Sequence, residues 1–468
     1  MLDFNCYLNT RIMKNYLKNI IAGGLILLSI SSCKKQLEIE PKQSISSGVA
    51  LSSPSDVQNA LTGAYTVLAS GDLYGTNLVF LPDIYASNNY LNWTGTFSTY
   101  RDISNKSIIS TNADVLRTWT SAYKAINVAN TVISALSVVT DPTAKSTIEG
   151  KALFIRGIMH FELVRLYALP FDATGTNTNL GVPIITKAVQ TTDDIVYSTP
   201  RNTVSEVYTA VENDLKASIT NLSSADDKYA SMAFLARVYL QEGKYALARD
   251  MANDIITSSP YSLITSSLEV PFRTKKSSEG IFEIAQNEQS NAGTSNDGLA
   301  TFYSSYQNST GGDVGRGDAS VNINFYNSFE TGDKRQTELI YDGDGAKSGK
   351  FTKKWYDYFG NIPVARITEQ YLIRAECNFR LGTTIGATPA SDINALRTRA
   401  GLGNVVPTLA IILNEREKEL DYEGFRLHDY KRTKRSIGTF SYNDPKLVFP
   451  IPDRELSANK GLVQNPGY

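Results

Sequence analysis

Residues 149–171, with the sequence EGKALFIRGIMHFELVRLYALPF, decide the fold class that the chain predicts. Apolar side chains recur here at steps of three and four residues, which indicates a helix with a broad apolar face. Pro170 lacks an amide donor and disfavours helix at the residue before it, so the helix is expected to end near Ala168. Gly157 lies on the apolar stripe, where a glycine suggests another helix passing close. The stretch therefore predicts a core helix of an α-helical array.

Other stretches repeat this periodicity before and after the central helix. Residues 231–256 have the spacing of a tetratricopeptide helical hairpin, with Gly243 in its turn. One hairpin cannot bury its apolar face alone, so the neighbouring helices are expected to be degenerate repeats of it. Further helices are expected at 53–71, where Ser53 and Asp56 provide capping side chains, and at 113–136, 204–222, 364–381, 391–400 and 409–433.

Two polar excursions interrupt the helical pattern, at 72–112 and 286–350. Both are too long for plain connections and are expected to be functional or irregularly folded. Residues 280–284 alternate like a short strand. The predicted architecture is mostly α: one large domain at 53–468, with tetratricopeptide-like helices over 53–258 and 364–433 and loop-rich excursions between them.

Composition narrows the class of partner. The 468 residues include 46 basic and 47 acidic side chains, and a net charge of −1 gives no reason to expect nucleic acid or an anionic membrane surface. Tyrosine dominates the aromatics, with 26 residues against 18 phenylalanines and 3 tryptophans. Its flat apolar face and polar rim suit sugar rings, although many of these tyrosines must pack between helices.

The first 32 residues have the features of an export signal. A basic start at Lys14 and Lys18 precedes an apolar run at 20–30, which is too short to span a bilayer. The polar residues before Met13 fit a signal poorly, so Met13 is the expected start of translation. The run ends in Ile30-Ser31-Ser32-Cys33, which resembles a bacterial lipobox. That resemblance implies that Cys33 carries lipid and that 33–52 form a tether; an ordinary cleaved signal peptide is the alternative.

Cys377 is the one cysteine that remains after Cys6 is excluded by the later start and Cys33 is lipidated. It has no partner for an internal disulfide. Because it lies on an apolar helix face, burial is expected.

The central helix also resembles the hallmark helix of the SusD/RagB family of nutrient-binding lipoproteins, which serve the outer membranes of Bacteroidetes-type bacteria. The matching residues are Glu149, Lys151, Ala152, Leu153, Arg156, His160, Phe161, Leu163, Tyr167 and Pro170. Later matches follow in the family's order: Asp333 and Arg335; residues 367–382; Asp392, Ile393, Asn394, Arg397 and Arg399; Glu415, Arg416, Glu419, Glu423, Gly424, Arg426 and Asp429; Pro450–Pro452; and Gln464–Tyr468. The resemblance covers essentially everything from Cys33 onward and departs from the family in the polar excursions.

The sequence offers little of the usual equipment of an enzyme. It has two histidines, His160 and His428, both within helical patterns and both expected to pack. HExxH, CxxC, GxSxG and P-loop motifs are absent from the sequence, so no enzyme activity, cofactor or metal is expected. A carboxylate pair for glycoside hydrolysis has no fixed spacing, so a glycan-cleaving enzyme stays open as an alternative.

Three further patterns are expected to be structural. Arg316-Gly317-Asp318 spells an adhesion tripeptide by coincidence, and 342–345 form a turn because the calcium-loop pattern breaks at Ala346. The mixed charges of 415–419 are expected to form a solvated, internally paired helix face.

The resemblance implies a lipid-anchored protein facing the exterior, which captures a glycan and passes it unchanged to a TonB-dependent, SusC-like transporter. Capture of peptides or another nutrient is the alternative that the family also permits. A glycan site needs flat rings beside amides, carboxylates or guanidinium groups, and the excursions supply these types. Composition alone selects six candidate ligand-binding residues: Trp93, Asn88, Asn89, Tyr303, Tyr306 and Arg316. The alternative for Trp93 is that it pins its loop into the core.

Overall fold

The central helix is α7 (Pro142–Tyr167), and it ends where Pro170 predicts, with Ala168 in an extended conformation. Its first turn is capped by the carboxylate of Asp141, which accepts from the amide of Ala144 at 2.6 Å. Nearly every side chain from 152 to 167 is buried, so the helix is enclosed on all sides rather than along one stripe.

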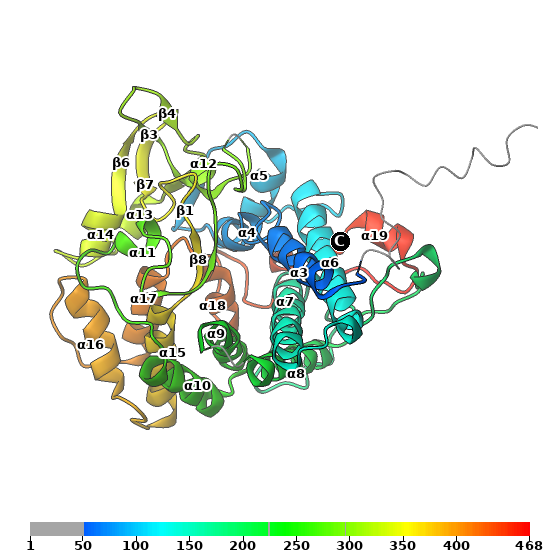
Figure 1. Ribbon diagram of the computed structural model, residues 1–468. Helices are drawn as coiled ribbons and strands as arrows, with labels where there is room; N and C mark the ends of the chain where they lie inside the picture. Colours follow the sequence, from blue (N-terminus) through cyan, green and yellow to red (C-terminus); the bar gives the residue numbers. More distant parts are fainter. Residues whose placement is uncertain (1–50, 223–224, 295) are drawn as a thin grey trace, which may run out of the picture. The chain divides into compact units, whose positions relative to one another are not determined.

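The computed structural model describes residues 51–468, with the exception of residues 223–224 and 295 and of the side chains of 225–226. The predicted signal segment, the lipidation residue Cys33 and all but the end of the tether lie outside the described residues. Residues Leu51–Tyr468 form one unit, shown in Figure 1.

The helical array is built from antiparallel neighbours. Tyr167, at the end of α7, donates its hydroxyl to the carbonyl of Val115 at the start of α6, while Arg156 contacts Asn130 further along α6. Gly243, with φ of 72°, makes the turn between α9 and α10. The helices of the array are α3 (Pro54–Leu68), α6 (Ala113–Ser134), α7, α8 (Val204–Asn221), α9 (Ala225–Glu242), α10 (Tyr245–Ser258), α15 (Ile367–Leu381), α16 (Pro389–Arg399), α17 (Leu409–Glu419) and α18 (Arg426–Arg432). This mostly helical, tetratricopeptide-like scaffold confirms the predicted fold class.

Gly157 has the role that the sequence predicts. A Cβ atom at this position would lie 3.2 Å from Cβ of Asp214 and 3.3 Å from Cγ of Leu215, both on α8. The two helices therefore pack closely at this point because the glycine has no side chain.

The excursions and the segments beside them fold into short helices and two-stranded antiparallel sheets, which lie mainly in the upper half of the view in Figure 1. Strand β1 pairs with β5, β2 with β8, β3 with β4, and β6 with β7. The elements are α4 (Asn77–Tyr85), β1 (Leu91–Trp93), α5 (Ser98–Ser104), α11 (Val270–Arg273), β2 (Gly280–Ile284), α12 (Leu299–Tyr303), β3 (Tyr306–Gln307), β4 (Asp313–Val314), β5 (Ala319–Val321), α13 (Ile323–Tyr326), α14 (Lys334–Leu339), β6 (Ile340–Asp344), β7 (Ser348–Thr352) and β8 (Ile362–Arg366). The remaining short elements are η1 (Leu136–Val138), η2 (Thr192–Asp194), η3 (Pro445–Leu447) and α19 (Asp453–Ala458).

Two predicted helices have different limits in the structure. The helix expected at 364–381 begins at Ile367, because 362–366 form β8 and pair with β2. The single long helix expected at 409–433 is two helices, α17 and α18. Between them Gly424 adopts φ of 81°, and a Cβ there would lie 2.9 Å from the carbonyl oxygen of Val79 in α4. The amide of Gly424 donates to the Asp83 carboxylate at 3.2 Å, so the neighbouring α4 fixes the break.

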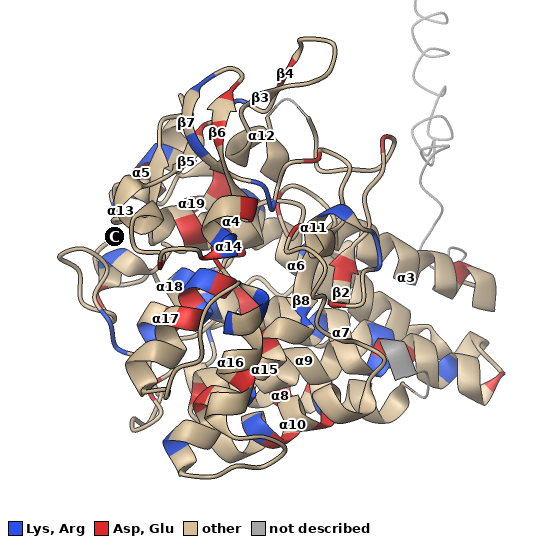
Figure 2. Cartoon of the chain, turned by 90° about the vertical axis from the view of Figure 1, so that its left-hand side faces the viewer, with Lys and Arg blue, Asp and Glu red and all other residues tan. Residues whose placement is uncertain are grey.

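Most charged residues of α17 are buried and pair with residues of other elements, so the expected solvated, internally paired face is wrong on both points. Glu415 and Arg416 are each 1% exposed. Arg335 of α14 donates to both oxygens of Asp333 and, at 2.8 Å, to Glu415. Figure 2 shows basic and acidic residues intermixed around α17 and α18. Buried charges are costly unless they are paired, so this network fixes α14 against α17.

Candidate ligand-binding site

Trp93 lies at the end of β1, where its backbone pairs with Ala319 of β5. Its partly buried ring packs at 5.4 Å from Tyr100 and 5.9 Å from Phe80, measured between ring centroids. A Cβ atom on Gly95 would lie 2.3 Å from the indole, so the backbone of Gly95 covers the ring. These contacts agree with the alternative that Trp93 pins its loop to the core.

Tyr303 is the last residue of α12 and is buried, with 1% of its surface exposed. Its hydroxyl donates to the carboxylate of Asp83 at 2.9 Å. Burial raises the pKa of Asp83 to about 8, which strengthens the tendency of this carboxyl group to stay protonated at neutral pH. In this structure Tyr303 therefore supports α4 and offers almost no surface to a ligand.

Asn88 and Asn89 belong to a cluster of side-chain amides beside the paired strands β1 and β5. We call this cluster, consisting of Asn88, Asn89, Asn92, Asn322 and Asn324, the asparagine patch. Asn322 donates to Asn92 at 2.7 Å, Asn324 donates to Asn89 at 3.1 Å, and Asn88 accepts from Lys106. Four of the five are exposed and Asn322 is partly buried. An amide has two donor hydrogens and two acceptor sites, so the patch keeps free capacity for ligand hydroxyls.

Tyr306 forms the end of a layered stack that we call the tyrosine stack: Tyr306, Tyr356 and Arg273. The two rings are nearly parallel, 8° apart in plane and 3.6 Å apart in centroid. The guanidinium of Arg273 lies 4.5 Å from the Tyr356 centroid, and therefore on that ring's other face. The Tyr306 hydroxyl donates to the carbonyl of Tyr356 at 3.2 Å, so the end ring is held rigidly while it stays partly exposed.

Burial, followed by the neighbouring Tyr356, raises the pKa of Tyr306 to about 12. Its hydroxyl is therefore neutral at physiological pH. The tyrosine stack offers a flat apolar face without a negative charge.

Each nitrogen of the Arg316 guanidinium contacts another side chain, and these three contacts leave part of its five N–H groups free. Its Nε lies 3.0 Å from Asp318, its NH1 donates to Asn296 at 3.1 Å, and its guanidinium lies 4.7 Å from the centroid of Phe97. Asp318 is 1% exposed and also pairs with Lys347 at 2.6 Å. Because Asp318 is buried, the Arg-Gly-Asp tripeptide is not presented on the surface, which supports the interpretation as coincidence.

The structure brings some of the six predicted residues together. Asn88 and Asn89 share the asparagine patch, and Trp93 and Arg316 lie at the other end of the β1–β5 pair. Tyr306 lies on the separate β3–β4 pair, which is joined to the 355–360 loop where the Tyr358 hydroxyl accepts from the amide of Gly315 at 2.6 Å. All of these elements lie in what we call the loop-rich part, which consists of the two excursions and the adjoining 355–360 loop (Figure 1).

Sequence reasoning missed Asn322, Asn324, Tyr356 and Arg273. The segment Trp355-Tyr356-Asp357-Tyr358-Phe359 carried a usable signal, because such a density of aromatic residues among polar ones is typical of a binding loop. It was missed because it falls just beyond the excursion limit predicted at 350.

The described residues contain no group of three or more His, Cys, Asp or Glu side chains arranged to hold a metal ion. Both histidines are buried, as their helical patterns predict. In the same part of the chain, no helix has the length and apolarity needed to cross a bilayer. The candidate site is thus a surface of rigid rings, amides and one guanidinium, which can recognise a flat, hydroxyl-bearing ligand.

A tetratricopeptide-like array with long loops between its helices defines the chain as a helical-repeat protein. Residues 35–240 match the sequence model of a SusD-like group described as starch-binding and associating with the outer membrane. Residues 356–447 match the model of the SusD family. The chain belongs to the SusD/RagB family.

Full-length relatives agree with these matches. SusD-like protein P2 of Formosa agariphila is 26% identical over 529 residues, covering 97% of this chain and all of the relative. A putative sugar-binding protein from Bacteroides vulgatus has 25% identity and a TM-score of 0.78, covering 90% of this chain and 99% of that one. Surface glycan-binding protein A from Bacteroides thetaiotaomicron, solved with laminarihexaose, shares the fold at 21% identity and a TM-score of 0.72, covering 88% and 99% of the two chains.

Proposed function

We propose that this protein is a lipoprotein of the outer membrane surface that binds glycans and delivers them, uncleaved, to a TonB-dependent transporter. The family description of starch binding at the outer membrane supports the ligand class and the location. A family relative named as sugar-binding, and a protein of the same fold solved with laminarihexaose, support a glycan as ligand.

The tyrosine stack carries the proposal among the features of the site. A pyranose ring presents C–H groups on one face, and these contact an aromatic face favourably. Because Tyr306 is already held by Tyr356 and by its own hydroxyl bond, it loses little conformational freedom when a ligand binds. The asparagine patch and Arg316 provide the hydrogen-bonding groups of the proposed surface.

Membrane attachment in this proposal depends on Cys33. A Cys33→Ala chain is expected to lose lipid labelling and to leave the membrane fraction, whereas a chain that stays membrane-bound without Cys33 would contradict the anchor. Delivery to the transporter is tested separately, by co-purification of the lipidated protein with a TonB-dependent barrel from the outer membrane of the same cells.

Glycan binding is tested by affinity electrophoresis of the Cys33→Ala protein through gels that contain plant, host or microbial polysaccharides. We expect one polysaccharide to retard the protein, and Tyr306→Ala to weaken that binding at least about tenfold, or ~1.4 kcal/mol. Tyr306→Phe keeps the ring and is expected to keep most of the affinity.

Tyr197→Ala is the matched control, because Tyr197 is 65% exposed and lies outside the loop-rich part. Trp93→Ala is a poorer probe, since it removes a ring packed against Tyr100 and Phe80 and would disturb the fold.

Retardation that survives Tyr306→Ala would exclude the tyrosine stack as the contact surface. Retention on a peptide column without any glycan binding would favour peptide capture, and release of oligosaccharide products would favour an enzyme.

A further inference from the structure

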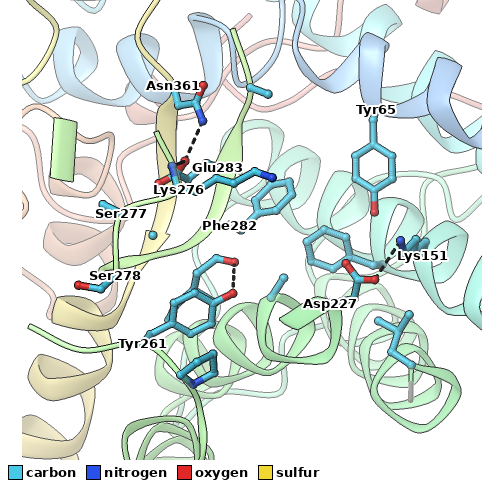
Figure 3. A pocket seen from close by; sticks show the side chains of 17 residues that line it. Tyr65, Lys151, Asp227, Tyr261, Lys276, Ser277, Ser278, Phe282, Glu283 and Asn361 are labelled. Carbon is cyan, nitrogen blue, oxygen red and sulfur yellow. Dashed lines mark hydrogen bonds and ion pairs between the residues drawn. The ribbon is translucent and has the colours of Figure 1, made fainter. Parts of the chain in front are cut away.

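A cavity of about 540 Å³ lies between the helical array and strand β2, apart from the asparagine patch and the tyrosine stack. Its walls come from α3, α7, α9, β2 and the loops around Tyr261 and Ser278 (Figure 3). This volume is within the range of small-ligand sites in proteins. The cavity is therefore large enough for one or two sugar rings.

Aromatic side chains form much of the wall: Tyr65, Phe154, Tyr261 and Phe282. Phe282 and Phe154 meet edge to face, with centroids 5.2 Å apart. The register of β2 against β8 shifts on both sides of Phe282, and this residue is left partly exposed at the cavity while Ile281 and Ile284 are buried. Rings from four separate elements thus face a common space, which suits a ligand with apolar faces.

The charges of the lining balance one another. Lys151 pairs with Asp227 at 2.9 Å on one side of the cavity in Figure 3. On the other side, Glu283 accepts from the backbone amide of Lys276 at 2.9 Å and from the side chain of Asn361 at 2.8 Å. Two lysines and two carboxylates leave no net charge, so the lining favours an uncharged ligand over an anion or a cation.

Two details of the rim point to a ligand. Lys276 has φ of 54°, a left-handed conformation that is uncommon for a residue with a side chain and that is held here by Glu283. Next to it, Ser277 is 6% exposed and its hydroxyl has no hydrogen-bond partner in the described structure. Buried polar groups are usually paired, so an unpaired hydroxyl in a cavity wall indicates a missing polar partner.

We infer that this cavity is a second carbohydrate site, which takes one or two neutral sugar residues, such as the end of a glycan chain. The aromatic walls contact the C–H faces of the sugar. Ser277, Ser278 and Asn361 lie on the side where its hydroxyl groups would bond. The inference rests on the proposed glycan-binding function, but it uses none of the residues of the loop-borne surface.

The test uses the Cys33→Ala protein and four neutral disaccharides: maltose, cellobiose, laminaribiose and xylobiose. Glucuronate and glucosamine serve as charged probes. Saturation-transfer NMR measures their binding, and affinity electrophoresis measures polysaccharide binding in parallel. Ser278→Trp and Ala285→Trp are two independent variants that fill the cavity mouth from exposed positions. Ser457→Trp, on exposed α19, is their matched control.

We expect a disaccharide signal in the unsubstituted protein, in Ser457→Trp and in Tyr306→Ala, and at least a tenfold loss of affinity in both plugged variants. Polysaccharide retardation is expected to persist in those plugged variants. A disaccharide signal that survives both plugs, or one lost with Tyr306→Ala alone, would overturn the second site and leave the proposed function intact. Preference for a charged probe would also overturn it. Absence of polysaccharide binding by the unsubstituted protein would instead contradict the proposed function.

Discussion

His160 is a buried imidazole that uses both of its ring nitrogens. Its Nδ1 lies 3.0 Å from the carbonyl oxygen of Arg156, and its Nε2 accepts from the amide of Ile185 at 3.2 Å. Burial, assisted by the nearby Arg156 guanidinium, lowers the pKa of His160 to about 3. The residue therefore attaches the 184–189 loop to α7 in the neutral form, which is the packing role that its helical pattern predicts.

The lowered pKa gives His160 a defined effect on stability. Between about pH 6.5 and pH 3 the unfolded chain binds a proton at this residue and the folded chain does not, so stability falls as the pH falls. His160→Gln should remove this contribution. The free energy of unfolding is measured with urea at pH 7 and at pH 5. Its decrease between these two pH values should be smaller by about 1–2 kcal/mol in His160→Gln than in the unsubstituted protein. Parallel pH profiles would contradict this account.

Tyr303 and Tyr306 mark the limit of what composition can predict about single residues. Composition selects both as candidates because the polar excursion contains tyrosines, and they are three positions apart. Tyr303 is buried by its bond to Asp83, which is 220 positions away in the sequence, whereas Tyr306 is left partly exposed on Tyr356. The local sequence therefore predicts a region for the candidate surface, but distant contacts decide which ring is exposed.

At the scale of elements, α14 and α17 are joined by charge. Arg335 is 1% exposed and donates to Asp333 and Glu415. Arg335→Met would leave the buried Asp333 carboxylate without an ionic partner and the buried Glu415 with Arg397 alone, so the free energy of unfolding should fall by about 3–5 kcal/mol. The matched control, Arg454→Met on exposed α19, should change it by less than about 0.5 kcal/mol. Equal effects of the two substitutions in urea titrations would show that the network contributes little.

Local signals predicted some element ends and missed others for a physical reason. The end of α7 follows from Pro170, and the start of α3 follows from the reciprocal cap between Ser53 and Asp56. The break between α17 and α18 depends on Gly424 meeting Val79 of α4, a contact between distant parts of the chain. The burial of the 415–419 charges has a similar origin, since their partners lie on other elements.

At the scale of the whole described chain, the helical array and the loop-rich part interlock. Trp355 donates its indole N–H to the carbonyl of Tyr422 at 2.6 Å, and Arg366 of β8 pairs with Glu423 at 2.7 Å. Because these bonds cross between the two parts, we expect residues 51–468 to unfold as one cooperative unit.

Tryptophan fluorescence tests this cooperativity. One variant keeps Trp119 of α6 as its only tryptophan and another keeps Trp355, with phenylalanine at the other tryptophan positions. Within each variant, the urea midpoint from fluorescence should coincide with that from far-ultraviolet circular dichroism. A Trp355 signal that changes well before helix content is lost would indicate that the loop-rich part unfolds separately.

Both excursions leave and re-enter the helical frame at neighbouring points. Helices α3 and α6, which flank the first, pack against each other, and β2 and β8, which flank the second, are paired strands with Glu283 opposite Pro363. Since the ends are already held together, doubling the length of such an insertion adds only about 0.6 kcal/mol of closure entropy. Descendants of this gene can therefore exchange, lengthen or shorten these two loops while the inherited helices stay unchanged, so that surface chemistry can diversify faster than architecture.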